Sequence, residues 1–551
     1  MKNRRPPPAA ASAMSLRSLS VCLFIVAGLC SSPSAGARGP LEDTGGGPSY
    51  VAAVYEHRVI LNPEPHVQLP RSAALEHVWK NMAIYEEQAA RAAQEGAQIL
   101  VFPEDGLQGF NHSRLSISGF LETVPDPQQE SWNPCTEPGT HNNTEILQRL
   151  SCMARRYSLY LVANMADLQP CPLSTDPSSS CPSDGRWQFN TDVVFRSDGL
   201  LVARYHKHNL YFEKAFDQPP APELVTFDTP FAGRFGVITC FDLLFHKPTI
   251  TLVEKGVRQL VYPTAWMNQL PLLAAVQFQR AFSLGANVSI LAANIRSDLL
   301  GMTGSGIFSP VSALHHHARQ GEPEEGKLLV ARLPVLDPLW RAKSEGVRGE
   351  TKGEAMGESW PTQPVDSRYC LQKESCLDSA PCPPPPFITP SLPLSPVTSS
   401  MMYDPFTFIL LSGTEGKVSV CDGPFCCHLQ YQRSVQEGST ELYALGAFAG
   451  THTVNGRYAL QVCALVRCAG TVASSCGQEV EEAETKMDFL LEGKFGTWHV
   501  YPSILASDLI LEQPDWLDQT ADGRVAMKHS KMTAGLITAC LYGRMYHLDH
   551  N

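Results

Sequence analysis

Short apolar runs alternate with helical segments between residues 50 and 335, and this alternation restricts the possible folds more than any other feature of the chain. A first helix is predicted over Ala74–Gly96, where apolar residues recur at spacings of three and four: Leu75, Val78, Met82, Tyr85 and Ala89. It leads into an apolar run at Gln98–Phe102, which is typical of a buried strand. Strands that alternate with helices form sheets with helices packed on their faces, so we expect an α/β domain over residues 49–336.

The same two patterns recur along the rest of this domain. Further helices are predicted over Thr144–Tyr157 and Leu270–Leu284. Further strands are predicted at Tyr50–Tyr55, Leu159–Ala163, Leu200–Tyr205, Arg234–Thr239, Val257–Tyr262 and Val288–Ala292.

The composition changes after residue 336. Residues 337–400 hold a charged, Gly-rich stretch, then Pro383–Pro386 and a Ser/Pro-rich run, which cannot build a packed core and predict a linker. From residue 401 onward, short apolar runs are separated by Gly-containing turns. These runs predict strands at Thr407–Leu411, Lys417–Val420, Leu442–Phe448, Tyr458–Leu465 and Trp498–Ile504. We expect a smaller, β-sandwich-like domain over residues 401–551.

The first 37 residues have the three parts of a secretory signal peptide. Basic residues, the last of them Arg17, precede the apolar run Val21–Leu29, and Ala35-Gly36-Ala37 offers small residues for cleavage. The apolar run is shorter than the roughly 20 residues that a membrane-spanning helix needs. We therefore expect a secreted, extracellular chain that begins after Ala37.

Secretion determines how the cysteines are interpreted. Of the 17 cysteines, Cys22 and Cys30 would leave with the signal peptide, and the others would enter an oxidising compartment in which thiols normally pair. Because the remaining number is odd, at least one thiol stays unpaired. We expect disulfides in the linker and the C-terminal domain, among Cys370, Cys376, Cys382, Cys421, Cys426, Cys427, Cys463, Cys468, Cys476 and Cys540.

Three N-x-[ST] sequons predict glycans on a secreted surface, at Asn111, Asn142 and Asn287. Asn287 lies beside the apolar run Val288–Ala293, so we expect it to be less exposed than the other two.

Cys240 is the first candidate for chemistry. It ends the apolar strand that includes Phe235–Thr239 and is followed by Phe241, so it lies where a strand turns and where backbone N–H groups can point at a carbonyl oxygen. That position suits a nucleophile. The structural alternative is a small buried hydrophobe or half of a disulfide, since cysteine is among the most buried residue types.

Two charged residues also follow predicted strands. Glu104 comes after Gln98–Phe102, where Pro103 ends the strand and Gly106 allows a turn. Lys207 comes directly after Leu200–Tyr205 and His206. Taken singly, each is more often a solvated surface residue.

The histidines offer an alternative chemistry. His206 and His208 flank Lys207, but two ligands are too few for a zinc site, which needs three or four. The run His315-His316-His317 lies in a Gly/Glu-rich region, where we expect the side chains to be solvated. We therefore expect no metal and no organic cofactor.

Together, Glu104, Lys207 and Cys240 form a more specific pattern. We expect them to lie at the ends of three successive strands of one sheet and to converge on one point. The carboxylate would act as general base, the thiol as nucleophile, and the ammonium would stand beside a developing oxyanion. Such a group of residues predicts covalent acyl transfer.

These residues also carry a resemblance. Phe102-Pro103-Glu104, the lysine strand and the cysteine strand resemble the three signatures of the nitrilase (carbon-nitrogen hydrolase) superfamily, which implies an α-β-β-α sandwich and a Glu-Lys-Cys triad. Further runs resemble its biotinidase and vanin branch, which joins a nitrilase domain to a C-terminal β domain: YVAAVYEH at 50–57, YPTAWMN at 262–268 and MTGSGI at 302–307. Other runs resemble the biotinidases more than the vanins: HNLYFE at 208–213, QLPLLAA at 269–275 and MMYD at 401–404.

The resemblance implies a substrate and a role for each residue. Cys240 would attack the amide of biocytin (biotin joined to the ε-amine of lysine) or of biotinyl peptides, and Lys207 and the N–H of Phe241 would hold the oxyanion. A thioester would form and be released by water, with biotinyl transfer to amines as a further outcome. Candidate pocket residues are Glu213, Trp266, Met267 and Asn268.

Two other functions remain open at this point. A vanin-like enzyme would hydrolyse the pantetheine amide with the same triad, but vanins are commonly lipid-anchored, and the polar residues 543–551 lack a hydrophobic tail, so we expect no membrane anchor. A secreted binding module that has lost catalysis would show a damaged triad. The 43 Lys and Arg residues against 55 Asp and Glu residues give a net charge of −12, which argues against nucleic acid as a partner.

Overall fold

Two stacked six-stranded sheets form the α/β part of the chain. The computed structural model describes residues 47–171, 181–319, 321–336, 395–434 and 438–549. The predicted signal peptide, most of the predicted linker, and Cys370, Cys376 and Cys382 lie outside these residues. Within them, no helix is both long enough and apolar enough to cross a membrane.

The first sheet has a parallel centre and antiparallel sides. β1, β2 and β3 run parallel, and β12, β4 and β5 extend the sheet with antiparallel pairing. Its strand order is β12 (Lys327–Pro334), β1 (Ser49–Glu56), β2 (Ile99–Val101), β3 (Tyr160–Pro170), β4 (Arg186–Phe195) and β5 (Leu201–His206).

The second sheet has the same kind of mixed pairing. β7, β8 and β9 run parallel, whereas β6, β10 and β11 are antiparallel to their neighbours. Its strand order is β11 (Ser312–His316), β10 (Ser305–Ser309), β9 (Ser289–Ala293), β8 (Gln259–Pro263), β7 (Gly233–Val237) and β6 (Thr226–Thr229).

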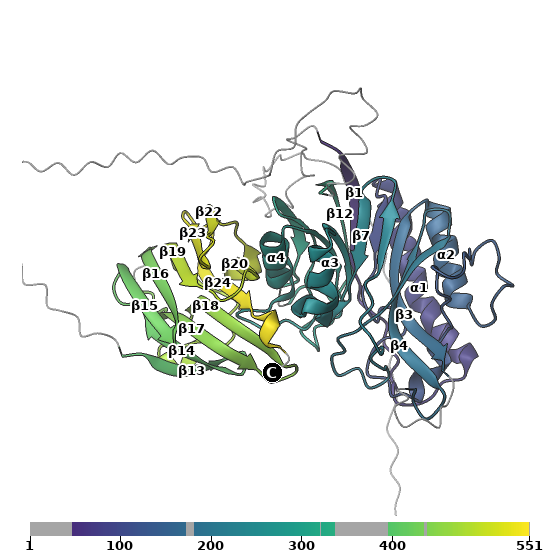
Figure 1. Ribbon diagram of the computed structural model, residues 1–551, viewed down its shortest axis with the longest axis horizontal. Coiled ribbons are helices and arrows are strands. Elements are labelled where there is room, and N and C mark those ends of the chain that lie inside the picture. The colour runs from purple at the N-terminus through teal and green to yellow at the C-terminus, as the bar shows by residue number, and fades with distance from the viewer. Residues whose placement is uncertain (1–46, 172–180, 320, 337–394, 435–437, 550–551) are drawn as a thin grey trace, which may run out of the picture. The chain divides into compact units, whose positions relative to one another are not determined.

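Helices cover the outer face of each sheet, which completes an α-β-β-α sandwich (Figure 1). The first sheet carries α1 (Arg71–Gln94) and α2 (Glu145–Tyr157), and the second carries α3 (Thr251–Glu254) and α4 (Ala275–Ala286). The predicted apolar stripe of α1 is confirmed, because Val78, Met82, Tyr85 and Ala89 are buried against the first sheet. The sandwich expected from the resemblance is therefore present.

Residue conformation explains where two of these helices end. α2 and α4 are followed by Ser158 and Asn287, which adopt left-handed φ values of 53° and 52°. Asn287 is exposed in this position, as Asn111 and Asn142 are, so the expectation that it would be set apart from them by lower exposure was wrong. Asparagine tolerates the left-handed conformation that ends a helix. The chain turns there, so that the Asn287 side chain lies at the surface and the next residue, Val288, is buried. α4 begins at Ala275, later than predicted, because the segment around Pro271 forms a turn closed by Gln269 and Leu273.

The C-terminal part is a sandwich of two antiparallel sheets, as predicted (Figure 1). The seven-stranded sheet has the order β13 (Val397–Met401), β14 (Asp404–Leu410), β17 (Tyr443–His452), β18 (Tyr458–Arg467), β24 (Leu536–Arg544), β20 (Val500–Ala506) and β21 (Ile510–Leu511). The five-stranded sheet has the order β15 (Glu415–Asp422), β16 (Phe425–Ser434), β19 (Lys486–Lys494), β23 (Arg524–His529) and β22 (Trp516–Gln519).

The hydrophobic cores show how these layers are joined. One core lies between the two C-terminal sheets. Another runs from the second α/β sheet through α4 into the seven-stranded sheet, where Phe278 and Phe282 of α4 contact the ring of Tyr501 at centroid distances of 5.8 and 5.0 Å. Gly285 permits this approach, because a Cβ atom there would lie 2.5 Å from the carbonyl oxygen of Val500.

Five disulfides are present among the described residues. Two lie in the α/β part, and three staple the C-terminal sandwich as expected: Cys135–Cys152, Cys171–Cys181, Cys421–Cys426, Cys427–Cys463 and Cys468–Cys476. Cys240 and Cys540 are unpaired thiols, and both are buried.

Candidate active site

Glu104, Lys207 and Cys240 reach one buried site from two different sheets. Glu104 follows β2 and Lys207 follows β5, both in the first sheet, whereas Cys240 follows β7 of the second. The expectation that all three end strands of one sheet was therefore wrong. β7 pairs with β6 and β8, and apolar periodicity shows that a strand is buried without showing which of two stacked sheets it joins.

Cys240 lies at a sharp turn between a strand and a helical turn. Its φ of 43° falls in the left-handed region, which is strained for a residue with a Cβ atom. The one-turn 3₁₀ helix Cys240–Leu244 begins here and is capped by reciprocal hydrogen bonds between Thr239 and Asp242. The hydroxyl of Tyr262 donates to the Cys240 carbonyl oxygen at 2.8 Å and holds the strained peptide in place.

The carboxylate of Asp242 is the anchor of this turn. It accepts hydrogen bonds from the Tyr205 hydroxyl at 2.6 Å, from the Thr239 N–H at 3.1 Å, and from the backbone and side-chain nitrogens of Asn209 at 3.0 and 2.7 Å. Tyr205 lies in β5 of the first sheet and Asn209 lies in the segment after it, each two residues from Lys207. Asp242 therefore ties the cysteine turn of one sheet to the lysine turn of the other.

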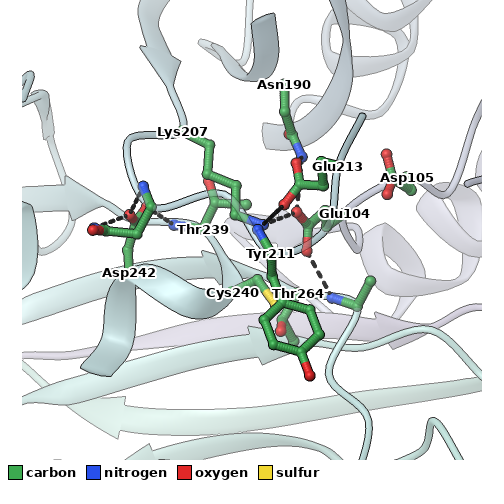
Figure 2. A network of polar contacts seen from close by, with 12 residues as sticks. Glu104, Asp105, Asn190, Lys207, Tyr211, Glu213, Thr239, Cys240, Asp242 and Thr264 are labelled. Atoms are coloured by element: carbon green, nitrogen blue, oxygen red, sulfur yellow. Dashed lines mark hydrogen bonds and ion pairs between the residues drawn. The ribbon is translucent and has the colours of Figure 1, made fainter. Parts of the chain in front are cut away.

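Lys207 lies between two carboxylates (Figure 2). Its Nζ donates to Glu104 Oε1 at 2.6 Å and also to Glu213 Oε1. The Asn190 side-chain amide joins the same two carboxylates, at 2.8 Å from Glu104 Oε1 and 2.7 Å from Glu213 Oε2. Lys207 is 1% exposed and Glu104 is 2% exposed, so neither is the solvated surface residue that each would most often be.

The electrostatics of this group keep Lys207 charged. Burial alone would lower the pKa of Lys207, but Glu104 and Glu213 raise it well above its ordinary value. Burial raises the pKa of Glu213, and the neighbouring Lys207 opposes that shift. In the described part of the chain, two of the three Nζ donors meet carboxylates, which leaves the third for a substrate oxygen.

The surroundings of Cys240 favour its neutral thiol. Burial raises its pKa, and the negative charge of Glu104 raises it further, while Lys207 and hydrogen bonds from Thr264 and Ala265 act in the opposite direction. The Ala265 N–H also donates to Glu104 Oε2 at 3.0 Å. The cysteine therefore needs a base to become a nucleophile, and a carboxylate adjoins the same backbone N–H.

Two cavities meet at Cys240. One is lined by the charged side chains of Glu104, Asp105, Lys207 and Glu213 together with apolar residues such as Phe216, and it is called the polar cavity here because it holds these charges. The other is lined mainly by aromatic and aliphatic side chains, among them Phe241, Leu244, Trp266, Leu273 and Tyr458. Cys240, Tyr211, Ala265 and Met267 line both.

Three of the four predicted pocket residues line these cavities, and the fourth, Asn268, does not. Trp266 lines the apolar cavity and Met267 lines both, whereas Glu213 lines the polar one. Asn268 lines neither. Its side-chain amide donates to the carbonyl oxygens of Gly301 and Thr303 at 3.0 Å, so it braces a neighbouring loop.

The histidines singled out in the sequence are paired with carboxylates or partly buried. His206 lies between Asp167 and Glu223, with one ring nitrogen 2.8 Å from each carboxylate. The expectation of a solvated histidine loop was wrong for His315 and His316, which belong to strand β11 and are partly buried. Two apolar residues followed by two histidines do not alternate, so the sequence did not indicate this strand, and His317, just after it, is also partly buried.

Asn190 and Asp242 were not among the predicted site residues. Asn190 begins the polar run Asn190-Thr191-Asp192 in strand β4, just before the apolar Val193–Phe195, and all three polar residues are buried. Buried polar groups require partners, so this run was the available signal. The sequence indicates Asp242 more weakly, only as an acidic residue two positions after the candidate nucleophile.

Family comparisons agree with this arrangement. Residues 66–295 match the carbon-nitrogen hydrolase family, and residues 395–549 match the vanin C-terminal domain. The chain is 68% identical to biotinidase from Takifugu rubripes, over 91% of this chain and 95% of that protein. It is 46% identical to biotinidase from Homo sapiens and 42% identical to pantetheinase from Mus musculus, in each case over 91% of this chain and 90% of the relative.

These relationships define the class of reaction. The matched domain is a hydrolase of carbon–nitrogen bonds, and the relatives cover nearly the whole chain at high identity. The protein is thus a carbon-nitrogen hydrolase that acts on amides, and it belongs to the biotinidase and vanin branch of the nitrilase superfamily.

Proposed function

We propose that the protein is a secreted amidohydrolase that cleaves biocytin and biotinyl peptides to release biotin. The observation that carries the reaction is the meeting of Cys240, Glu104 and Lys207 in one buried site. The choice of substrate is supported by the 68% identity to a biotinidase over 91% of the chain. An apolar cavity beside Cys240 also suits the methylene chain next to the biotin carboxyl.

Acylation begins with transfer of the Cys240 proton to Glu104 as sulfur attacks the amide carbonyl. The carbonyl oxygen becomes an oxyanion, which receives the third Nζ donor of Lys207 and the N–H of Phe241. Lys207 is already charged and held by two carboxylates, so little reorganisation is needed when the negative charge develops.

Glu104 then gives its proton to the departing lysine amine, and the biotinyl group remains on Cys240 as a thioester. Glu104 is again a carboxylate and takes a proton from water, which attacks the thioester and releases biotin. An amine in place of water would receive the biotinyl group instead.

Secretion is supported by the disulfides. Five pairs form among the described residues, and disulfides persist in oxidising compartments. The side chains of Asn111, Asn142 and Asn287 are all exposed and accessible to glycosylation.

A side-by-side assay of the purified protein on biocytin and pantetheine tests the proposed substrate. We expect a higher kcat/KM for biocytin, since the pantetheine acyl group carries an amide and hydroxyls where biotin has methylenes. A preference for pantetheine would support the vanin-like activity that the 42% identity to a pantetheinase allows. Cleavage of neither substrate would favour a binding module.

The reactivity of Cys240 should reveal its neutral thiol. Because burial and Glu104 raise its pKa, we expect alkylation by iodoacetamide in the free enzyme to be slow at pH 7 and to keep rising through pH 9. Peptide mapping would separate Cys240 from Cys540, whose pKa burial also raises. A rate that is already at a plateau at pH 6 would indicate a preformed thiolate and contradict general-base activation.

A further inference from the structure

The two cavities at Cys240 assign the two halves of the substrate, given the proposed function. The departing nitrogen must reach Glu104 to receive a proton, and Glu104, Lys207 and Glu213 line only the polar cavity. The amine half therefore lies on that side. The acyl chain is attached to the opposite side of the same carbonyl carbon, so it extends from Cys240 into the apolar cavity.

The C-terminal domain supplies one side of this apolar cavity. Tyr403 comes from the turn between β13 and β14, and His452, Val454, Asn455 and Tyr458 come from the turn between β17 and β18 and from the strand residues beside it. The Asp404 carboxylate lies 2.8 Å from His452 Nδ1 and joins the two turns. The run MMYD at 401–404 thus belongs to a structural element beside the site.

Close contacts fix these turns against the cysteine turn. A Cβ atom on Gly456, whose φ is 139°, would lie 2.8 Å from the ring of Phe241, the residue after the nucleophile. Tyr211, which lines both cavities, makes a side-chain hydrogen bond with Asn455. The distance from the C-terminal turns to the reacting carbonyl is therefore set by direct packing.

A buried arginine reinforces the same contact. Arg544 of β24 is 0% exposed, and its Nε donates to the carbonyl oxygen of Leu244 at 2.9 Å, at the end of the 3₁₀ helix that begins with Cys240. Its guanidinium also lies 4.9 Å from the centre of the Tyr458 ring. Its charge is paired with the Asp549 carboxylate at 2.7 Å, so the guanidinium is fixed within the C-terminal domain and presents Nε to the cysteine turn. Separation of the two domains would leave that buried Nε–H without its acceptor, which costs free energy.

We propose that the turns carrying Tyr403 and Asn455 form the end wall of the acyl pocket and select the acyl group of the amide. The group that fits is an unbranched aliphatic chain ending in a compact polar ring. Phe241, Trp266 and Leu244 contact the chain, whereas the amide of Asn455 both donates to and accepts from a polar head such as a cyclic urea. The α/β domain carries the reacting residues, and the C-terminal domain contacts and recognises the far end of the acyl group.

Two substrates with the same leaving group test this proposal: biocytin and Nε-pentanoyl-lysine, which has the aliphatic chain of biotin without its ring system. Tyr403→Ala and Asn455→Gly remove the side chains of the wall, and glycine keeps the left-handed φ of 59° at residue 455. Trp498→Ala is the matched control, because Trp498 is an aromatic residue of the same domain that is 59% exposed, close to the 62% of Tyr403, and lines neither cavity.

We expect each wall variant to lower kcat/KM for biocytin by about 10-fold or more, because the loss of one contact in a specificity pocket has an effect of that size. The kcat/KM for pentanoyl-lysine should change by less than about 2-fold. The preference of the wild type for biocytin should shrink accordingly, and the control should keep it. Equal losses on both substrates, or no loss on biocytin, would overturn the acyl-wall assignment. Failure of the wild type to cleave biocytin would instead overturn the proposed function and the assignment that rests on it.

Discussion

Replacing Cys240 by alanine is expected to lower kcat for biocytin cleavage by about 10⁴- to 10⁶-fold, the range found when a nucleophile is removed from a catalytic triad. The loss should be this large because no other described group at the site can form the thioester, and Glu104 would be left to activate water without covalent assistance. The free energy of unfolding should change only slightly, because the substitution removes one buried sulfur atom at a strained turn.

Cys540→Ala is the matched control for this variant. Cys540 is the other unpaired thiol of the described chain, is also buried, and lies in β24 of the C-terminal domain. The control should retain near-wild-type kcat. If Cys240→Ala kept a tenth of the activity, or if Cys240 proved to be disulfide-bonded in active protein, the nucleophile would have to be another residue.

Replacing Lys207 by methionine should reduce kcat by at least about 10² to 10³, because removal of one donor to an oxyanion has that effect and this donor is charged. The variant should also be less stable. Without the ammonium, Glu104 and Glu213 are two buried carboxylates that share the hydrogen bonds of Asn190, and breaking a buried ion pair costs about 3–5 kcal/mol.

The pH dependence of this instability has a definite sign. Adjacent carboxylates without a cation have a raised pKa in the folded state, so the folded variant binds a proton more tightly than the unfolded chain does. Its stability relative to the wild type should therefore improve as the pH falls through that raised pKa. Thermal unfolding at pH 5 and pH 8 measures the difference.

A double variant separates the two roles of Lys207. Lys207→Met with Glu213→Gln removes one of the two carboxylates and should recover most of the lost stability while kcat stays low. Recovery of activity together with stability would mean that Lys207 serves only to hold the fold, as would near-full activity in the single variant.

Much of the fold could be predicted from the sequence because the central strands and covering helices are strongly periodic. The stripe of α1 and the apolar runs of β1, β7, β8 and β9 were placed to within a few residues. Strand β4 was missed because the polar run from Asn190 to Asp192 precedes its short apolar segment Val193–Phe195. Those polar side chains are buried at the site, so the local pattern failed where a functional group had to be held.

The site could be predicted only as far as single strand ends allow. Each of Glu104, Lys207 and Cys240 follows an apolar run, which is visible in the sequence. The distribution of these runs over two stacked sheets is not visible, because it depends on which strands exchange backbone hydrogen bonds. Asp242 and Asn455 act through partners far away in the chain, Tyr205 and Tyr211, and no spacing rule connects them.

Turnover in the presence of hydroxylamine tests the thioester on Cys240 most directly. A thioester holds the biotinyl group after lysine has left, so the product depends on which nucleophile then reaches the carbonyl. We predict that biotin hydroxamate forms in proportion to hydroxylamine and at the expense of biotin. Biotin alone at every hydroxylamine concentration would indicate direct attack by water activated by Glu104, and would contradict a nucleophilic role for Cys240 even if its replacement abolished activity.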